Sequence, residues 1–198
     1  LFFFTPKTAY AILSGLVGSE MCIRDSHLAV EYEEAVEAIN LLISEGIRIS
    51  KFHFSSAMKV HPQPEVLQGL VPFAEDIYFH QVIARSNNGD LRRYRDLPDA
   101  LDLANKGLTL DDDEWRIHFH LPLHCLPTEL FDTTVDQLQS VIEYLGQNPS
   151  LCSHIEMETY TWEVLPEGFR QRDVVDQLFG EYNWTLSKLA DQGICLLN

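Results

Sequence analysis

The sequence predicts an α/β fold in which strands alternate with helices. Three observations support this: apolar stripes with helical spacing, segments in which apolar and polar residues alternate, and the order in which the two kinds of segment follow one another. Strand, helix and strand in succession form βαβ units, and the helix returns the chain so that the two strands are parallel. We therefore expect a parallel sheet covered by helices, with one inserted hairpin.

The first predicted unit is a helix followed by a strand. Residues 31–45 place their apolar side chains on one helical stripe, and Gly46 is suited to end the helix. Residues 47–54 alternate apolar and polar side chains and predict a strand. Residues 55–57 are expected to form the loop after it, and residues 64–71 a short helix.

A hairpin is predicted next. Residues 77–84 are rich in residues that favour strands, and the turn residues 87–90 lead into a partner strand at residues 91–94. Residues 98–106 then predict a short helix. The acidic run at residues 111–114 is expected to be a solvated loop.

The last part of the chain contains two more predicted strand and helix pairs. Residues 115–121 predict a strand, and the spacing of Thr134 and Gln137 is that of a capping box before a helix that ends at Gly146. Residues 154–160 predict a strand and residues 173–189 a final amphipathic helix. The apolar stripe of that helix consists of Val174, Val175, Leu178, Tyr182 and Leu186.

Charge and cysteine use exclude several classes of function. The formal net charge is −16, and nucleic acids and anionic membranes bind basic surfaces, so no nucleic-acid partner is expected. The sequence has four cysteines and no CxxC motif, which fits a reducing cytoplasm and argues against a thiolate metal cluster. These cysteines are Cys22, Cys125, Cys152 and Cys195.

Residues 1–26 have the character of a translated sequencing adapter. Polar residues around Lys7 interrupt the apolar opening, so it predicts neither a signal peptide nor an inserted membrane span. Residues 21–26 can be encoded by the transposon end used in sequencing-library preparation, and residues 16–20 fit the adapter bases before it in the same frame. We expect residues 1–26 to be an artefact outside the fold and residues 27–198 to form one domain, which carries the whole net charge and all eight histidines.

Polar residues occur near the ends of three predicted strands. His53 belongs to the first strand, and His118 and His120 belong to the second. Glu156 and Glu158 belong to the third and share one face of it. In a parallel barrel, the carboxyl ends of the strands line the active site. Imidazole and carboxylate groups are natural ligands of zinc, manganese or magnesium. The alternative is that these residues lie on a solvated face, which is less expected in a parallel sheet covered by helices.

Other residues carry weaker signals. His80 is expected at the surface or in a local hydrogen bond rather than as a ligand, because it belongs to the predicted hairpin. Trp162 either walls a pocket or packs in the core. No glycine-rich phosphate loop, GxSxG elbow or HExxH motif is present in the sequence, which argues against nucleotide-dependent and serine-hydrolase chemistry.

Five collinear segments carry a resemblance to a known family. They are HLAVEYE (27–33), KFHFSSAM (51–58), VPFAEDIYFHQV (71–82), WRIHFHLPL (115–123) and HIEMETYTWEVLP (154–166). They resemble the EboE-type proteins, which are xylose-isomerase-like barrel proteins of a bacterial metabolite-traffic gene cluster. The resemblance extends over residues 27–198, and ETYTWEVLP is its most specific motif. It implies a partial (β/α) TIM barrel made of the C-terminal strands and helices with the inserted hairpin.

The resemblance also implies a divalent metal, Mn, Mg or Zn, held by two Glu, one Asp and one His. His53 and Glu158 correspond to metal ligands, and Glu158 and His27 to catalytic residues. The resemblance further suggests His118, His120 and Trp162 as substrate-binding residues. His27 resembles the His of a D-x-x-H motif, but the position of its Asp is occupied by Arg24.

Three functional hypotheses follow from the resemblance. The first is a metal-dependent isomerase or epimerase, in which the metal polarises a small polyhydroxylated metabolite and a carboxylate moves a proton. The second is a protein that binds and handles a metabolite without catalysis. The third is that the chain is a truncated fragment without function. We expect a small-molecule partner, no membrane insertion and a cytoplasmic location.

Overall fold

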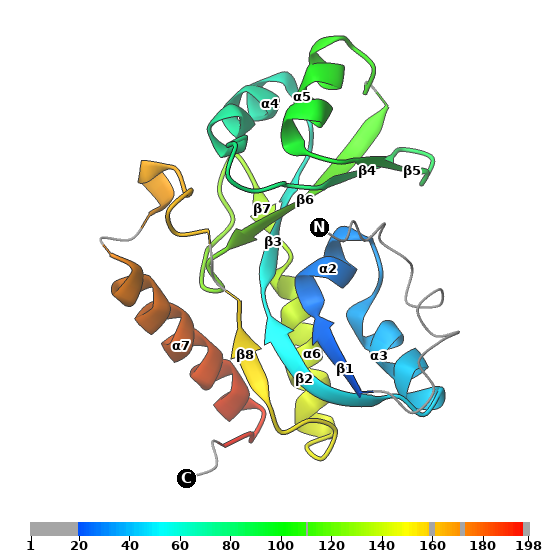
Figure 1. Ribbon diagram of the computed structural model, residues 1–198, viewed down its shortest axis with the longest axis vertical. Coiled ribbons are helices and arrows are strands. Elements are labelled where there is room, and N and C mark those ends of the chain that lie inside the picture. Colours follow the sequence, from blue (N-terminus) through cyan, green and yellow to red (C-terminus); the bar gives the residue numbers. More distant parts are fainter. Residues whose placement is uncertain (1–19, 110, 159–160, 171–172, 196–198) are drawn as a thin grey trace.

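The computed structural model describes residues 20–109, 111–158, 161–170 and 173–195. In these ranges, eight strands and six α-helices form a mixed α/β structure with two sheets (Figure 1). The predicted α/β class is therefore confirmed. The arrangement of the strands differs from the prediction, because the two sheets are of different types.

The first sheet is parallel and contains three strands. Its order is β1 (Glu20–Arg24), β2 (Arg48–Phe54) and β8 (Ile155–Met157), with Phe52 paired to Ile155. This confirms the predicted parallel pairing of the strands that carry His53 and Glu156. Strand β8 is shorter than the predicted range 154–160, of which residues 159 and 160 lie outside the described residues.

The second sheet is antiparallel and contains five strands. Its order is β5 (Leu91–Tyr94), β4 (Val82–Ser86), β6 (Asp112–Leu121), β3 (Ser56–Val60) and β7 (Asp132–Thr133). The predicted hairpin is confirmed as the β4–β5 pair. Strand β6 is antiparallel to both its neighbours, so the expectation that it lies parallel to β2 is wrong.

Strands β2 and β3 are two parts of one extended run, interrupted only at Ser55. The prediction of a loop at residues 55–57 is wrong, because Ser56 already begins β3. The acidic residues Asp112 to Glu114 likewise belong to β6 rather than to a loop, and Asp112 accepts a hydrogen bond from Trp115 Nε1 at 2.8 Å. The chain therefore leaves one sheet and enters the other at Ser55.

Helices cover the parallel sheet, and shorter helices flank the antiparallel one (Figure 1). Helices α3 (Ala35–Ser44) and α6 (Val135–Gln147) contribute to one core with β2, and Gly46 after α3 has the positive φ expected of a helix-ending glycine. The remaining helices before α7 are α2 (Asp25–Val30), α4 (Pro64–Leu70) and α5 (Leu97–Asn105).

Each sheet has its own apolar core. Phe52 and Phe54 of β2 are fully buried in the first core, and Trp115, Ile117 and Phe119 of β6 are fully buried in the second. The side chains on β6 alternate, so His118 and His120 point away from the second core. Burial of these large side chains provides most of the free energy that holds each layer together.

Tyr32 joins the link between α2 and α3 to the antiparallel sheet. Its φ is 60°, which is costly for a residue with a side chain. The guanidinium groups of Arg116 and Arg85 lie 4.0 and 4.9 Å from the centre of its ring, and its hydroxyl donates to the carbonyl of Glu114 at 2.9 Å. These contacts hold the link between α2 and α3 against β6 and offset the backbone strain.

The start of α6 differs from the predicted capping box. The Thr134 side chain makes no cap hydrogen bond, and its hydroxyl instead accepts from the backbone N–H of Ala57 at 2.8 Å. Helix α6 also continues through Gly146, which was predicted to end it. Thr134 therefore joins α6 to β3 where that strand begins.

Helix α7 (Val174–Asp191) lies with its predicted apolar stripe outward. Val175 and Tyr182 are 67 and 56 % exposed, and Gln177 and Glu181 are buried instead. The predicted helix is present, and most of its predicted apolar stripe lies outside the core. Glu181 explains part of the orientation, because it accepts hydrogen bonds from Leu123 N and Gln177 Nε2, each at 3.2 Å.

Residues 20–26, within the segment predicted to be adapter-derived, occupy a place in the parallel sheet. Met21 and Ile23 of β1 pack in the first core, and residues 25 and 26 begin α2. Residues 1–19 lie outside the described residues, and the origin of the segment stays a prediction. In the described part of the chain, no helix is long and apolar enough to cross a bilayer.

Substituting Thr134→Ala should lower the free energy of unfolding by about 1–3 kcal/mol, because it leaves the buried N–H of Ala57 without an acceptor. Thr134→Ser keeps the hydroxyl and should lose much less. Urea unfolding of the two variants measures the difference. Equal losses in both variants would show that the threonine methyl, rather than the hydrogen bond, matters.

Candidate functional site

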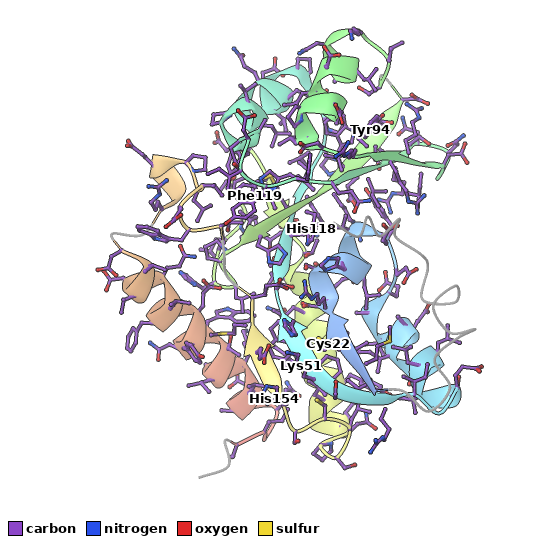
Figure 2. The ribbon with its side chains drawn as sticks, viewed as in Figure 1. Cys22, Lys51, Tyr94, His118, Phe119 and His154 are labelled. Carbon is purple, nitrogen blue, oxygen red and sulfur yellow. The ribbon has the colours of Figure 1, made fainter. Side chains whose placement is uncertain are left out.

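The carboxyl ends of β2, β6 and β8 meet at one place. Strand β6 reaches it because it runs antiparallel to β3, and β3 starts where β2 ends. Glu158 N donates to Phe54 O at 3.0 Å, and His120 Nδ1 lies 3.3 Å from Glu158 O. In Figure 2, His118 lies between β6 and α2, and Lys51 lies further down on β2.

Three imidazoles gather at this meeting point. The Nε2 atoms of His118 and His120 are 2.9 Å apart, and the rings of His27 and His118 are in edge contact with centroids separated by 4.2 Å. We call His27, His118 and His120 the histidine cluster. The structure therefore brings together three residues that the sequence analysis selected from α2 and β6.

The contacts of the histidine cluster define how its protons are arranged. A carbonyl oxygen can only accept, so His120 Nδ1 carries a proton and donates it to Glu158 O. In its neutral form, His120 then has an unprotonated Nε2, which accepts from Nε2–H of His118. The hydrogen bonds thus run in one direction, from His118 through His120 to the backbone of Glu158.

The environment of the cluster favours neutral imidazoles. Burial lowers the pKa of His120 to about 4, and burial with the neighbouring His27 and His120 holds the pKa of His118 well below its ordinary value. Burial of part of its ring, with His120 and Arg24 nearby, also lowers the pKa of His27. His27 is nevertheless exposed on one side, so solvent screens these effects more than at His120.

Charged side chains cover the adjoining face of the parallel sheet. Lys51 Nζ lies 2.9 Å from Glu156 Oε2, and Arg24 Nη1 lies 3.1 Å from Glu158 Oε1. His53 lies between the two carboxylates, with Nε2 3.0 Å from Glu156 and Nδ1 4.0 Å from Glu158. Hydrogen bonds from Lys51 and His154 lower the pKa of Glu156 to about 2.

Two polar atoms at this face have no hydrogen-bond partner among the described residues. They are His53 Nε2 and Glu158 Oε2, and both are buried. His53 Nε2 is close to Glu156, but the angle is not that of a hydrogen bond, so the contact is only electrostatic. Buried polar groups without a partner are uncommon and indicate a place where a ligand or water can bind.

Asp25 lies beneath the cluster. It is fully buried and accepts from Ser55 N at 2.9 Å, and burial raises its pKa to about 8 although the hydrogen bonds from Ser55 oppose the rise. The Ser55 hydroxyl lies 2.8 Å from Ser26 Oγ, which is 3.5 Å from His120 Nε2. Polar contacts therefore connect the strand switch at Ser55 to the histidine cluster.

The implied divalent metal does not fit the residues that the structure describes. His53 and Glu158 lie near each other as expected, but no group of three or more His, Cys, Asp or Glu side chains among the described residues could hold a metal ion. The guanidinium of Arg24 also contacts Glu158, so the carboxylate already has a cation beside it. We therefore derive no chemical step through a metal.

Two residues lie apart from their predicted surroundings. Trp162 is half-buried, its Nε1 has no hydrogen-bond partner, and its ring lies 5.3 Å from the Arg170 guanidinium, so its role in substrate binding stays a prediction. His80 is completely buried, and its Nε2 lies 2.9 Å from Oε1 of the nearby Glu75. Of the two predicted alternatives, the surface position is therefore wrong and the local hydrogen bond is confirmed.

Two neighbours of the site were not selected from the sequence. Arg24 was assigned to the adapter, although its position three residues before His27 marks it as a neighbour of the site. Glu156 was noted as sharing a face with Glu158 but received no role. Its strand spacing was the signal that could have identified it, because residues two apart on a strand face the same side.

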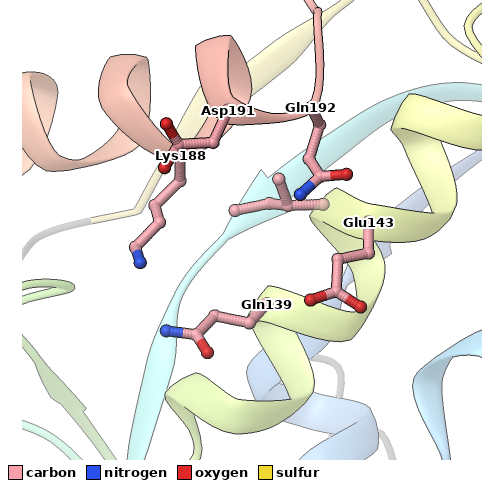
Figure 3. Close-up of a pocket in the computed structure, with 6 residues that line it drawn as sticks. Gln139, Glu143, Lys188, Asp191 and Gln192 are labelled. Carbon is pink, nitrogen blue, oxygen red and sulfur yellow. The ribbon is translucent and has the colours of Figure 1, made fainter.

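A separate groove lies between α6 and α7. Figure 3 shows that its lining is largely polar. It shares no residue with the histidine cluster. The lining residues are Gln139, Ile142, Glu143, Lys188, Asp191 and Gln192.

Comparisons with protein families, curated proteins and solved structures find no match to this chain. The resemblance to EboE-type proteins therefore stays a prediction that rests on the quoted sequence segments.

The histidine cluster should make the fold sensitive to acid. His120 has a pKa of about 4 in the folded state and an ordinary value of 6.5 when unfolded, so the unfolded state binds more protons in between. The free energy of unfolding is expected to fall as pH decreases from about 6.5 to 4, by on the order of 3 kcal/mol for this residue. Urea unfolding over this pH range measures it.

Proposed function

We propose that the histidine cluster, together with His53 and Glu158, binds a small polyhydroxylated metabolite and moves a proton on it. The observation that carries the proposal is the pair of buried polar atoms without partners, His53 Nε2 and Glu158 Oε2. Hydroxyl groups can donate to both atoms. Neutral imidazoles suit such a ligand, because they require no countercharge.

The chemistry would be proton transfer beside a carbonyl. The Glu158 carboxylate takes a proton from the carbon next to the carbonyl, and the electron pair moves onto the carbonyl oxygen to give an enediolate. Glu158 then returns the proton to the former carbonyl carbon, while the proton of the neighbouring hydroxyl moves to the former carbonyl oxygen, so the carbonyl group changes places between the two carbons. An imidazole N–H near the carbonyl oxygen stabilises the negative charge that develops there. His27 is the most exposed member of the cluster, so it is the one best placed to exchange a proton with water.

We further propose that the chain forms part of a xylose-isomerase-like (β/α) barrel of the EboE type. The parallel order β1–β2–β8 and the polar groups at the carboxyl ends of β2 and β8 are consistent with one side of such a barrel. Strand β6 departs from it, because it belongs to the antiparallel sheet. Fold alone does not determine activity, so the function is argued from the side chains of the site.

Binding without catalysis is the second candidate, and one contact favours it. Arg24 lies 3.1 Å from Glu158 Oε1, so the carboxylate is already held by a guanidinium and is less free to approach a carbon of the ligand. In that case, the site would hold a metabolite for traffic without changing it. The two candidates differ in whether hydrogen on the ligand exchanges with the solvent.

The proposal places the protein in the cytoplasm. The four cysteines are free in the described structure, and Cys125 and Cys152 are only partly buried. Free thiols persist where glutathione and thioredoxin keep the compartment reducing. The acidic net charge likewise suits a small-molecule partner better than a nucleic acid.

Deuterium exchange tests the proposed proton transfer. D-xylulose incubated with the protein in deuterated water should gain deuterium beside its carbonyl, as followed by proton NMR. Glu158→Gln removes the base and should slow the exchange by roughly 100-fold or more. Glu143→Gln, which changes a carboxylate in the groove between α6 and α7, should leave the rate unchanged.

The same experiment separates the two candidates. Saturable binding of D-xylulose in calorimetry without deuterium uptake would favour the binding-only role. Uptake that Glu158→Gln does not slow would show that another base acts. Neither binding nor uptake for a panel of unphosphorylated ketoses and aldoses would contradict both candidates.

We expect Arg24 to determine whether His53 and Glu158, the predicted metal ligands, can bind one metal ion. Arg24→Asp removes the cation beside Glu158 and adds a third ligand to His53 and Glu158, so Mn²⁺ or Zn²⁺ should bind at least about tenfold more tightly than to the unaltered chain. Arg24→Asn is the matched control without the charge. Calorimetry with each ion measures the affinities, and equal values for both variants would argue against a metal role for this site.

A further inference from the structure

His80 occupies a fully buried position next to the histidine cluster. Its side chain is 0 % exposed, and its ring packs on Phe119 with centroids 4.7 Å apart. His80 N donates to Asp96 Oδ1 at 2.9 Å, which anchors its backbone to the start of α5. The residue lies just before β4, outside any regular element, so its position depends on these specific contacts.

The segment around His80 holds both backbone groups of His118. His118 N donates to Gln81 O at 2.8 Å, and His80 Nδ1 lies 3.3 Å from His118 O. The first contact is of the kind that joins neighbouring strands. The contact of His80 Nδ1 with His118 O is made by a side chain, so it does not follow from the pairing of β4 with β6.

His80 is held in turn by Glu75. His80 Nε2 lies 2.9 Å from Glu75 Oε1, and the side chain of Glu75 is mostly buried. Both neighbours of the His80 ring are acceptors, a carbonyl and a carboxylate. The two contacts are satisfied together when the pair holds two protons, one on Nδ1 and one shared between Nε2 and the Glu75 carboxylate.

We propose that His80 is a positioning residue for His118. Its Nδ1–H donates to the His118 carbonyl, and Glu75 prevents the ring from turning away. The contact fixes the backbone from which the His118 side chain faces His120, and so preserves the direction of the hydrogen bond between the two imidazoles. The effect of this positioning on ligand binding rests on the proposed function. The positioning itself does not require a ligand.

Side-chain NMR of the full chain labelled with ¹⁵N-histidine tests the proposal. His80→Phe keeps a ring against Phe119 but has no N–H for His118. The His118 and His120 ring signals should then lose their fixed tautomers, and the N–H proton between them should exchange with water about tenfold faster. His80→Gln keeps an amide donor and should restore the tautomers and the slow exchange.

A purely structural role for His80 gives a different result. It predicts lower stability in His80→Phe, with unchanged ¹⁵N shifts for His118 and His120, and that outcome would overturn the proposal. If His80→Phe does not fold, Glu75→Gln and Glu75→Ala replace it. The glutamine can still contact His80 Nε2, so Glu75→Gln should keep the His118 tautomer. Glu75→Ala removes this contact and should lose the fixed tautomer. Identical spectra for the two variants would also overturn the proposal.

These spectra are recorded without a metabolite. Loss of the His118 tautomer in His80→Phe, together with neither binding nor deuterium uptake for any sugar of the ketose and aldose panel with the unaltered chain, would support the positioning role and contradict the proposed function. Unchanged tautomers in His80→Phe, together with clear binding of a sugar to the unaltered chain, would contradict the positioning role and support the proposed function. The two proposals can therefore fail separately.

Discussion

The whole arrangement depends on the passage of one strand from one sheet to the other at Ser55. A residue between two sheets loses its ladder partners, and its backbone groups must find others. Ser55 N donates to Oδ1 of the buried Asp25 carboxyl group, and two residues later Ala57 N donates to the Thr134 hydroxyl. These side chains allow β2 to end and β3 to begin without a connecting loop, and this brings β6 to the carboxyl ends of β2 and β8.

The consequence for the site is that histidines and carboxylates reach it from sheets of different types. The histidines of β6 arrive on an antiparallel strand backed by its own apolar core, whereas His53 and Glu158 arrive from the parallel sheet. Burial keeps the imidazoles of β6 neutral, and ion pairs with Lys51 and Arg24 balance the carboxylates. The site is therefore polar but has almost no net charge, which suits a ligand with hydroxyl groups.

Sequence patterns predicted the elements well because helices, turns and alternation are local properties. The presence of α3, the hairpin of β4 and β5, and the helix nature of α7 followed from periodicity and turn residues, although α3 begins at Ala35 rather than at residue 31. The division of the strands into two sheets could not be predicted, because the Ser55 switch depends on Asp25 and Thr134, which are distant in sequence. The outward stripe of α7 was missed for a similar reason, since the buried contacts of Glu181 with Leu123 are not visible in its own periodicity.

Arg24, the last residue of β1, affects the charge of the site more than it affects the fold. Met21 and Ile23 pack in the core and hold β1 beside β2, as many alternating apolar strands could. Arg24 instead pairs in register with His53, and its side chain reaches Glu158. The apolar pattern of β1 is thus enough to place it in the parallel sheet. The electrostatic character of the site depends instead on the Arg24 side chain at the end of the strand. A guanidinium there leaves Glu158 paired and the neighbouring imidazoles neutral, and a carboxylate would turn the same backbone into an anionic site that attracts cations.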